Sequence, residues 1–401
     1  MNFLSDRVQS IEPSATVAIS TKAMQLKKQG LDIISLSAGE PDFPVAEHIA
    51  QAMIQAIQNH QTKYTELDGT PELKKAITQK LLQDNQLNYS TDQILVSVGA
   101  KHSFYNLFAA VLNPGDEVII LAPYWVSYPA MAKLMGAVPV ILTPPENSQN
   151  LKIQAEQIQQ AITPKTKLLV LNSPSNPTGE IYSKEELEKI GNLLKNNKNI
   201  IIASDDIYEK IIWSNQKSHQ KFHNILNTNP ELYDQTIVIN GVSKSHAMTG
   251  LRIGYAAGPK EIIKAMSKIQ GQSTSNPCSI AQAGAVAALL GNQDHIPVMV
   301  QAYKTRQDFL FEKLNQIPGF IFNGAEGAFY AFVNIKQAIL NLNLNPNDDV
   351  KFCEFLLEKA LVAAVPGSAF GMPGYVRFSY ATDLKTLETA CERITQALLH
   401  S

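Results

Sequence analysis

The feature that most constrains the fold of this chain is an alternation, through its middle, of short β-branched runs with longer stretches of helical periodicity. The run Ile94–Val98 has the composition of a strand. Apolar residues after it, from Phe104 to Leu112, recur at the spacing of one helix face. This alternation is typical of an α/β domain with a mostly parallel central sheet. Further strands are predicted at Val118–Leu121, Lys167–Leu171, Ile200–Ala203 and Thr236–Ile239.

The pattern changes after about residue 290 to long helices and a few strands, the last of them at Val376–Tyr380. A chain of 401 residues is long enough for two or three domains. We therefore expect a large domain at residues 46–290. A smaller α+β domain is expected from both chain ends, residues 1–45 and 291–401.

Composition narrows the class of protein. A formal net charge of −2 argues against a nucleic-acid binder, and 45% hydrophobic residues argue against extended disorder. The longest apolar runs are far below the roughly 20 residues of a membrane span, and the first residues lack a signal-peptide core. Three scattered cysteines fit a reducing compartment, and the histidines show no metal-ligand spacing. We expect a cytoplasmic enzyme with no metal, nucleic-acid or membrane partner.

Candidate functional residues collect just after the predicted strands, where ligands bind in open α/β sheets. Gly99-Ala100-Lys101 follows the first strand, and small residues at a helix start suit an anion such as phosphate. A plain tight turn is the alternative. Asn176 lies between two prolines after the third strand, a context that is also common in ordinary turns. Asp205 and Asp206 follow the fourth strand, either as a helix N-cap or with one carboxylate facing a positive group.

Three basic residues lie in apolar surroundings. Lys244 and Arg252 are the only charged residues of a small, apolar stretch after the fifth strand. A lysine placed there can have its pKa lowered by desolvation, as Schiff-base chemistry requires. Only five of the 34 basic residues are arginine, so an arginine in apolar surroundings needs an explanation. Because its planar guanidinium suits bidentate binding of anions, we expect Arg252 to bind a phosphate and Arg377 a carboxylate. The alternatives are a surface position for Lys244, a purely structural role for Arg252 and a solvated strand edge for Arg377.

Several of these segments resemble, in order and spacing, the class I aminotransferases, which are pyridoxal 5′-phosphate (PLP) enzymes of fold type I. The resemblance extends along essentially the whole chain and is strongest to the bacterial aspartate and prephenate aminotransferases. The matching segments are PSATVAIS, LSAGEPDFP, KYTELDGTPELKKAI, SVGAKHSFYN, APYWVSYP, NSPSNPTG, SDDIYE, NGVSKSHAMTGLRIGYAAGP and VRFSYAT.

The resemblance implies a role for each matched residue on the cofactor side. Lys244 is expected to form a Schiff base with PLP and to move the proton of the substrate Cα. Asp205 is expected to keep the pyridine nitrogen protonated. Tyr208 and Asn176 are expected to hydrogen-bond the ring oxygen, and Trp125 to stack on the ring. Lys244, Asp205 and Tyr208 are thus the expected catalytic residues.

The resemblance also implies a phosphate site and a homodimer. Tyr64 is similar to a tyrosine that reaches the phosphate across the dimer interface. The other residues expected at the phosphate are Gly99, Ala100, Lys101, Ser243 and Arg252.

On the substrate side, Arg377 and Gly39 match positions that hold the α-carboxylate, beside Trp125 and Asn176. Lys101 with Thr16 is expected to hold the distal carboxylate of an acidic substrate. A lysine on a flexible stem tolerates different substrate shapes better than a guanidinium fork does. The alternative is that Lys101 only neutralises the phosphate.

The chain departs from the family pattern at three places. Asp206 stands where the family usually has glutamate, and it is expected not to contact the cofactor. Gly241 stands where other subgroups carry a phosphate-binding serine, a contact that Ser243 can supply. No arginine lies near Gly271–Cys278, where another subgroup binds acidic side chains.

The expected activity is ping-pong transfer of an amino group between L-aspartate or L-glutamate and 2-oxo acids. Prephenate, which gives arogenate, is a further candidate acceptor. Two alternatives within the fold remain open: an aminotransferase for neutral or aromatic amino acids, and a PLP β-lyase. A third alternative is a non-catalytic PLP-fold protein that binds or regulates.

Overall fold

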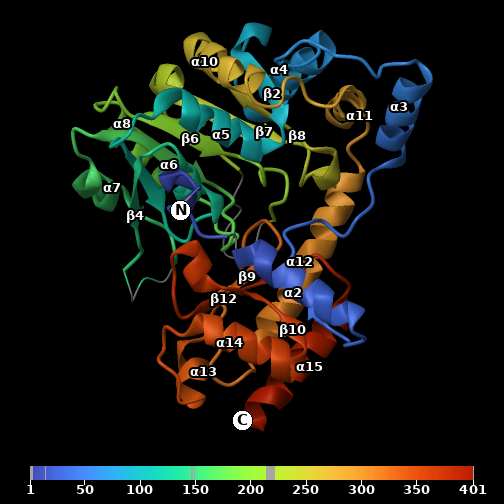
Figure 1. Ribbon diagram of the computed structural model, residues 1–401, viewed down its shortest axis with the longest axis vertical. Coiled ribbons are helices and arrows are strands. Elements are labelled where there is room, and N and C mark those ends of the chain that lie inside the picture. The colour runs from blue at the N-terminus through green and yellow to red at the C-terminus, as the bar shows by residue number, and fades with distance from the viewer. Residues whose placement is uncertain (1–2, 14, 146–147, 149, 214–221, 401) are drawn as a thin grey trace.

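A computed structural model describes residues 3–13, 15–145, 148, 150–213 and 222–400. Figure 1 shows two parts, a large domain around one sheet and a smaller domain that contains the C-terminus. Helix α12 (His295–Leu314) runs between the two parts. The other α-helices are α1 (Asp6–Gln9), α2 (Ala15–Lys28), α3 (Glu47–Gln58), α4 (Pro71–Asn85), α5 (Ala100–Val111), α6 (Ser127–Leu134), α7 (Ala155–Ala161), α8 (Lys184–Leu194), α9 (Ile225–Thr228), α10 (Lys260–Gly271), α11 (Ser279–Leu290), α13 (Lys336–Asn341), α14 (Asp349–Phe355) and α15 (Leu384–Leu399).

The large domain is built on a seven-stranded sheet in the order β2-β8-β7-β6-β5-β3-β4. Strand β8 runs antiparallel to both of its neighbours, and the other neighbouring pairs are parallel. This confirms the predicted α/β architecture with a mostly parallel sheet. The strands are β2 (Ile94–Val98), β3 (Glu117–Leu121), β4 (Val138–Leu142), β5 (Thr166–Asn172), β6 (Ile201–Asp205), β7 (Thr236–Gly241) and β8 (Ile253–Ala257).

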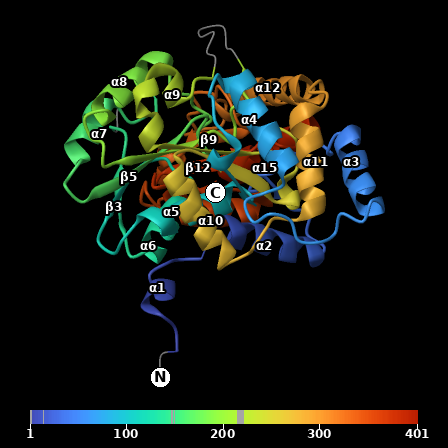
Figure 2. The same cartoon turned by 90° about the horizontal axis from the view of Figure 1, so that it is seen from above.

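Helices cover both faces of this sheet, so its strands bury apolar side chains on both sides. Leu169 and Leu171 of β5 pack with α4, α8 and α11 residues, whereas Leu168 and Val170 pack with residues of α5, α6 and α10. Figure 2 shows α5 and α10 on one side of the sheet and α4 and α8 on the other. A strand that is buried on both faces has a continuous run of apolar residues in its sequence, and this pattern predicts five of these strands.

The small domain joins the two chain ends. Strand β1 (Ile34–Ser35) pairs with β10 (Val362–Ala363), and a second sheet has the order β11-β12-β9. Its central strand, β12 (Tyr375–Ser379), confirms the strand predicted at Val376–Tyr380, displaced by one residue. Strands β9 (Tyr330–Asn334) and β11 (Val365–Pro366) flank it.

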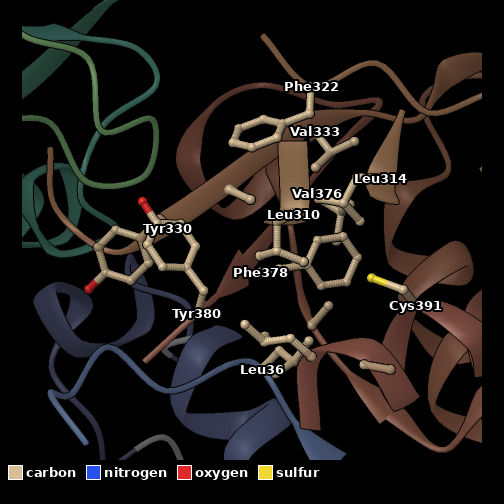
Figure 3. Packing of buried hydrophobic residues seen from close by; sticks show 14 of the residues in the cluster. Leu36, Leu310, Leu314, Phe322, Tyr330, Val333, Val376, Phe378, Tyr380 and Cys391 are labelled. Carbon is tan, nitrogen blue, oxygen red and sulfur yellow. The ribbon is translucent and has the colours of Figure 1, made fainter. Parts of the chain in front are cut away.

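An apolar cluster fills the small domain between its sheet and helices α12, α14 and α15. Figure 3 shows this packing around Phe378 and Leu310, with Tyr330 and Tyr380 at its margin. Among the described helices, none combines the length and apolarity needed to cross a lipid bilayer. The described residues contain no cluster of three histidine, cysteine or acidic side chains suited to a metal ion.

Candidate active site

A cavity of about 380 Å³ lies between the carboxyl ends of the parallel strands and the small domain. It brings together residues from segments as distant in the sequence as the N-terminal helix α2 and strand β12. Twelve of the fourteen predicted site residues line it: Thr16, Gly39, Ala100, Lys101, Trp125, Asn176, Asp205, Tyr208, Ser243, Lys244, Arg252 and Arg377.

The two other predicted residues lie outside the lining. Gly99 packs against the Arg252 side chain. Gly99 has φ +80°, and an added Cβ would lie 2.4 Å from the Arg252 Nη2 atom. Gly254 is equally constrained, since its Cβ would lie 2.1 Å from the Ala100 nitrogen. These glycines let the arginine side chain and the start of α5 approach closely. Tyr64 is 92% exposed at the molecular surface, so one chain does not bring it to the cavity.

Lys244 follows β7 and points into the cavity, where its Nζ donates a hydrogen bond to the carbonyl oxygen of Gly39. Burial lowers the pKa of Lys244 to about 8, and the positive charge of Arg377 adds to the effect. About half of this amine is therefore neutral, and hence nucleophilic, at about pH 8, where an ordinary lysine is almost fully protonated. The alternative of an ordinary surface lysine does not describe this environment.

The two adjacent aspartates point to opposite sides of the chain. Asp205 lines the cavity and accepts hydrogen bonds from the Tyr128 hydroxyl and, at 3.3 Å, from the Ile207 nitrogen. Burial raises its pKa to about 6, against the effect of the Tyr128 hydrogen bond. The residues after Asp206 form a turn rather than a helix, so the pair is not a helix N-cap.

Asp206 is buried on the far side of this turn. Its carboxylate accepts hydrogen bonds from Ser204 Oγ at 2.7 Å and from Asn224 Nδ2 at 2.6 Å. Burial, and then the nearby charge of Glu209, raises the pKa of Asp206. Its contacts thus lie away from the cavity.

Arg377 lies in the middle strand of the small-domain sheet and is only 2% exposed, so it is not at a solvated edge. Its Nη1 donates to Asn176 Oδ1 at 3.0 Å, and its Nη2 donates to the Ser37 carbonyl at 2.7 Å. The guanidinium carbon lies 4.5 Å from the Tyr330 ring centroid and 5.0 Å from that of Phe370. Its Nε has no hydrogen-bond partner among the described residues. A buried donor without a partner is costly, which suits a site that binds a carboxylate.

Two cations lie near the start of α5. Lys101 Nζ is 4.9 Å from the centroid of the Trp125 ring, and Arg252 Nη1 donates to the Thr249 carbonyl at 2.8 Å. Burial, together with the charge of Arg252, lowers the pKa of Lys101. Within the described part of the chain neither cation forms an ion pair with a carboxylate. Two such cations beside a helix N-terminus are an arrangement that favours an anion.

Four residues at the site were missed by the sequence prediction: Ser37, Tyr128, Tyr330 and Phe370. Tyr128 lies inside a matched segment, so its polar hydroxyl in an apolar helix is a signal that could have been used. Tyr330 and Phe370 have no such signal, because an aromatic residue in an apolar run is ordinarily part of a core. Ser37 takes part through its backbone carbonyl, which side-chain identity does not reveal.

Comparison with known proteins identifies the family. Residues 31–394 match the model of the family described as aminotransferase class I and II. The chain belongs to this family. It is an aminotransferase, which confirms the resemblance drawn from the sequence segments and excludes the non-catalytic alternative.

Individual relatives cover the whole chain. An aspartate/prephenate aminotransferase of Nitrosomonas europaea is 50% identical over 98% of this chain and 99% of its own length. An aspartate aminotransferase of Geobacillus stearothermophilus is also 50% identical, over 98% of both chains. The solved aspartate aminotransferase of Rhizobium meliloti is 41% identical with a TM-score of 0.92, covering 99% of both chains. That of Thermus thermophilus with maleate is 41% identical, with a TM-score of 0.90 over 99% of this chain and all of the other. These structures confirm fold type I.

We predict that Lys244 reacts with an aldehyde probe at lower pH than the other lysines do. PLP is added to the cofactor-free protein at a series of pH values, adducts are reduced with borohydride, and labelled peptides are quantified. Labelling of Lys244 is expected to rise with pH around a midpoint of about 8 and to level off roughly one pH unit higher, where most of its amine is neutral. An ordinary lysine, with a pKa near 10.5, continues to gain reactivity beyond that point. A label on another lysine, or no plateau for Lys244, contradicts the assignment.

Proposed function

We propose that this aminotransferase uses PLP to transfer the amino group between aspartate or glutamate and 2-oxo acids. The observation that carries the proposal is the meeting of three groups in one cavity. These are an amine of lowered pKa at Lys244, a buried carboxylate at Asp205, and the Arg377 guanidinium, whose Nε has no partner among the residues that the structure describes. The names of the relatives, aspartate and aspartate/prephenate aminotransferases, support the same substrates.

The residues present fit PLP. Gly99 and Gly254 let the Arg252 side chain and the start of α5 approach closely. This brings Lys101 and Arg252, neither of which forms an ion pair with a carboxylate of the described residues, to the N-terminus of α5, and such an arrangement suits a phosphate. The proposed phosphate ligands are Gly99, Ala100, Lys101, Ser243 and Arg252. When bound, PLP supplies an electron sink that makes the proton at the substrate Cα removable.

The chain's own residues would then hold the cofactor and move protons. Asp205 would keep a proton on the pyridine nitrogen, because a charge-assisted pair is strong where water is excluded. Tyr208 and Asn176 would donate hydrogen bonds to the ring oxygen, and Trp125 would pack on the ring. Lys244 would hold the cofactor through its aldehyde and take the proton from the substrate Cα.

Substrate recognition follows from the two anion sites. Arg377 and the backbone at Gly39 hold the α-carboxylate, beside Trp125 and Asn176. Lys101 and Thr16 hold the distal carboxylate of an acidic substrate. The Thr16 hydroxyl is buried with no hydrogen-bond partner in the described residues, and it lines the same cavity as Lys101. A substrate carboxylate gives both groups a partner.

A homodimer completes the phosphate site in this proposal. Tyr64 is 92% exposed, so it is free to reach the cavity of a partner subunit. Helix α3, which precedes it, lies at the margin of the molecule and exposes Ile54 and Ile57 to 45% and 52%. Such apolar exposure on one element suits a subunit interface. We propose a large domain at residues 46–290 and a small domain at residues 1–45 and 291–401. We also propose that the protein is cytoplasmic.

We predict that Lys101→Ser weakens acidic substrates selectively. The loss of one charge-assisted hydrogen bond is expected to raise KM about tenfold to a hundredfold for aspartate, glutamate and prephenate. The slower reactions of alanine and phenylalanine are expected to keep their KM. Steady-state kinetics with each substrate tests this, and equilibrium dialysis of PLP is the control.

Two results contradict this reading of Lys101. If all substrates lose activity alike while PLP binding weakens, Lys101 is a cofactor ligand only. If phenylalanine or alanine is the best substrate of the unchanged enzyme, the neutral or aromatic aminotransferase is the correct alternative. Release of pyruvate and ammonia from a substrate with a β-leaving group identifies a β-lyase.

We predict that Asp205→Asn and Asp206→Asn, two matched isosteric variants, separate catalysis from stability. Asp205→Asn is expected to lower kcat about a hundredfold to a thousandfold, since the pyridine proton is then unsupported. Asp206→Asn is expected to keep turnover, because Asp206 does not line the cavity, and to lose about 1 kcal/mol of stability, because its hydrogen bonds to Ser204 and Asn224 change. Kinetics and urea unfolding of both variants provide the measurement. The reverse order of severity in kcat refutes the assignment.

A further inference from the structure

Tyr330 of strand β9 contacts both halves of the candidate active site. Its hydroxyl oxygen lies 2.8 Å from that of Tyr208, on the cofactor side. Its ring lies 4.5 Å from the guanidinium carbon of Arg377, on the substrate side. The residue is fully buried and lines the cavity, and Figure 3 shows its hydroxyl pointing away from Leu310 and Phe378 of the apolar cluster.

The hydrogen bond between the two tyrosines has a direction once the cofactor is bound. A hydroxyl has one proton and can donate only one hydrogen bond. If Tyr208 donates its proton to the ring oxygen of PLP, the contact with Tyr330 must be one in which Tyr330 donates. Consecutive hydrogen bonds polarise each other, so donation by Tyr330 makes Tyr208 the stronger donor.

The ring of Tyr330 has a second and separate partner. The guanidinium carbon of Arg377 also lies 5.0 Å from the centroid of the Phe370 ring, so the two aromatic rings together pack against Arg377. A planar guanidinium gains from such stacking and keeps its orientation. Phe370 is thus a natural control, because it shares the contact with Arg377 and lacks the hydroxyl.

We propose that Tyr330 is a positioning residue that links the two halves of the site. Its hydroxyl strengthens Tyr208 as a hydrogen-bond donor to the cofactor oxygen, and its ring orients Arg377 toward the substrate carboxylate. This inference deepens the proposed function and rests on it. Other titratable groups that face Tyr208 are Arg377, Asp205 and Lys244, and all of them stay in place when only the Tyr330 hydroxyl is removed.

The test compares Tyr330→Phe with Phe370→Leu in the PLP-loaded enzyme. The first readout is the pH midpoint of the visible absorbance of bound PLP, which reports the charge on its ring system. A hydrogen bond to the ring oxygen stabilises the deprotonated form, so weaker donation by Tyr208 raises the midpoint. For Tyr330→Phe we expect a rise of about half a unit to one unit, corresponding to one lost hydrogen bond.

Kinetics provides the second readout. Tyr330→Phe is expected to lower kcat about threefold to tenfold and to leave KM for aspartate within about twofold, because the ring on Arg377 remains. Phe370→Leu is expected to do the opposite: KM rises about threefold to tenfold and the absorbance midpoint stays unchanged. The midpoint is read from bound cofactor only, so partial loss of folded protein does not obscure it.

Two outcomes overturn the inference. An unchanged midpoint in Tyr330→Phe shows that its hydroxyl does not act on Tyr208. An equal rise in KM for both variants, with no split between them, shows that Tyr330 is only a packing residue. If the unchanged protein binds no PLP, or its bound PLP has no band that depends on pH, the proposed function itself fails, and that result is distinct from either of these.

Discussion

The burial of Arg377 is the constraint on which the rest of the site depends. A guanidinium with 2% exposure is stable only if its donors have partners, because an unpaired buried charge is costly. The fold supplies two of them, Asn176 from the large domain and the Ser37 carbonyl from the N-terminal segment. It leaves Nε without a partner among the described residues. The arginine thus holds separate segments together at one wall of the cavity and keeps binding capacity for a carboxylate.

The opposite wall depends on the sheet. Parallel strands end at one edge, so Asp205, the last residue of β6, and Lys244, which follows β7, converge there. The antiparallel strand β8 begins directly after Arg252, which has φ +55° and lies against Gly99. The cavity therefore contains several cations and few carboxylates, which raises the local concentration of anionic ligands. A phosphate and a dicarboxylic substrate both fit this electrostatic pattern.

Sequence predicted the part of the molecule that depends on local pattern. The five strands predicted for the large domain and the one predicted near the end of the chain are present. Lys244 and Arg252 were found because they follow a strand in apolar surroundings, whereas residues such as Tyr208, Trp125 and Gly39 were expected only from the family resemblance. Strands β4 and β8 were missed, since β4 contains a proline and β8 is made mainly of small residues that give little strand signal. The pairing of Tyr330 with Tyr208 depends on how the small domain packs on the large one, and no local pattern encodes it. Tyr64 belongs to an interface that a single chain does not contain.

The central claim, that this cavity performs PLP-dependent amino transfer with acidic substrates, is tested most directly by a single half-reaction. PLP-loaded enzyme is mixed with aspartate in the absence of any 2-oxo acid, and the cofactor absorbance and the released oxaloacetate are recorded in a stopped-flow and quench experiment. The account predicts loss of the aldehyde-form absorbance with one oxaloacetate released per chain, and a much slower reaction with alanine at the same concentration. An unchanged spectrum with aspartate, or equal rates with aspartate and alanine, would contradict it.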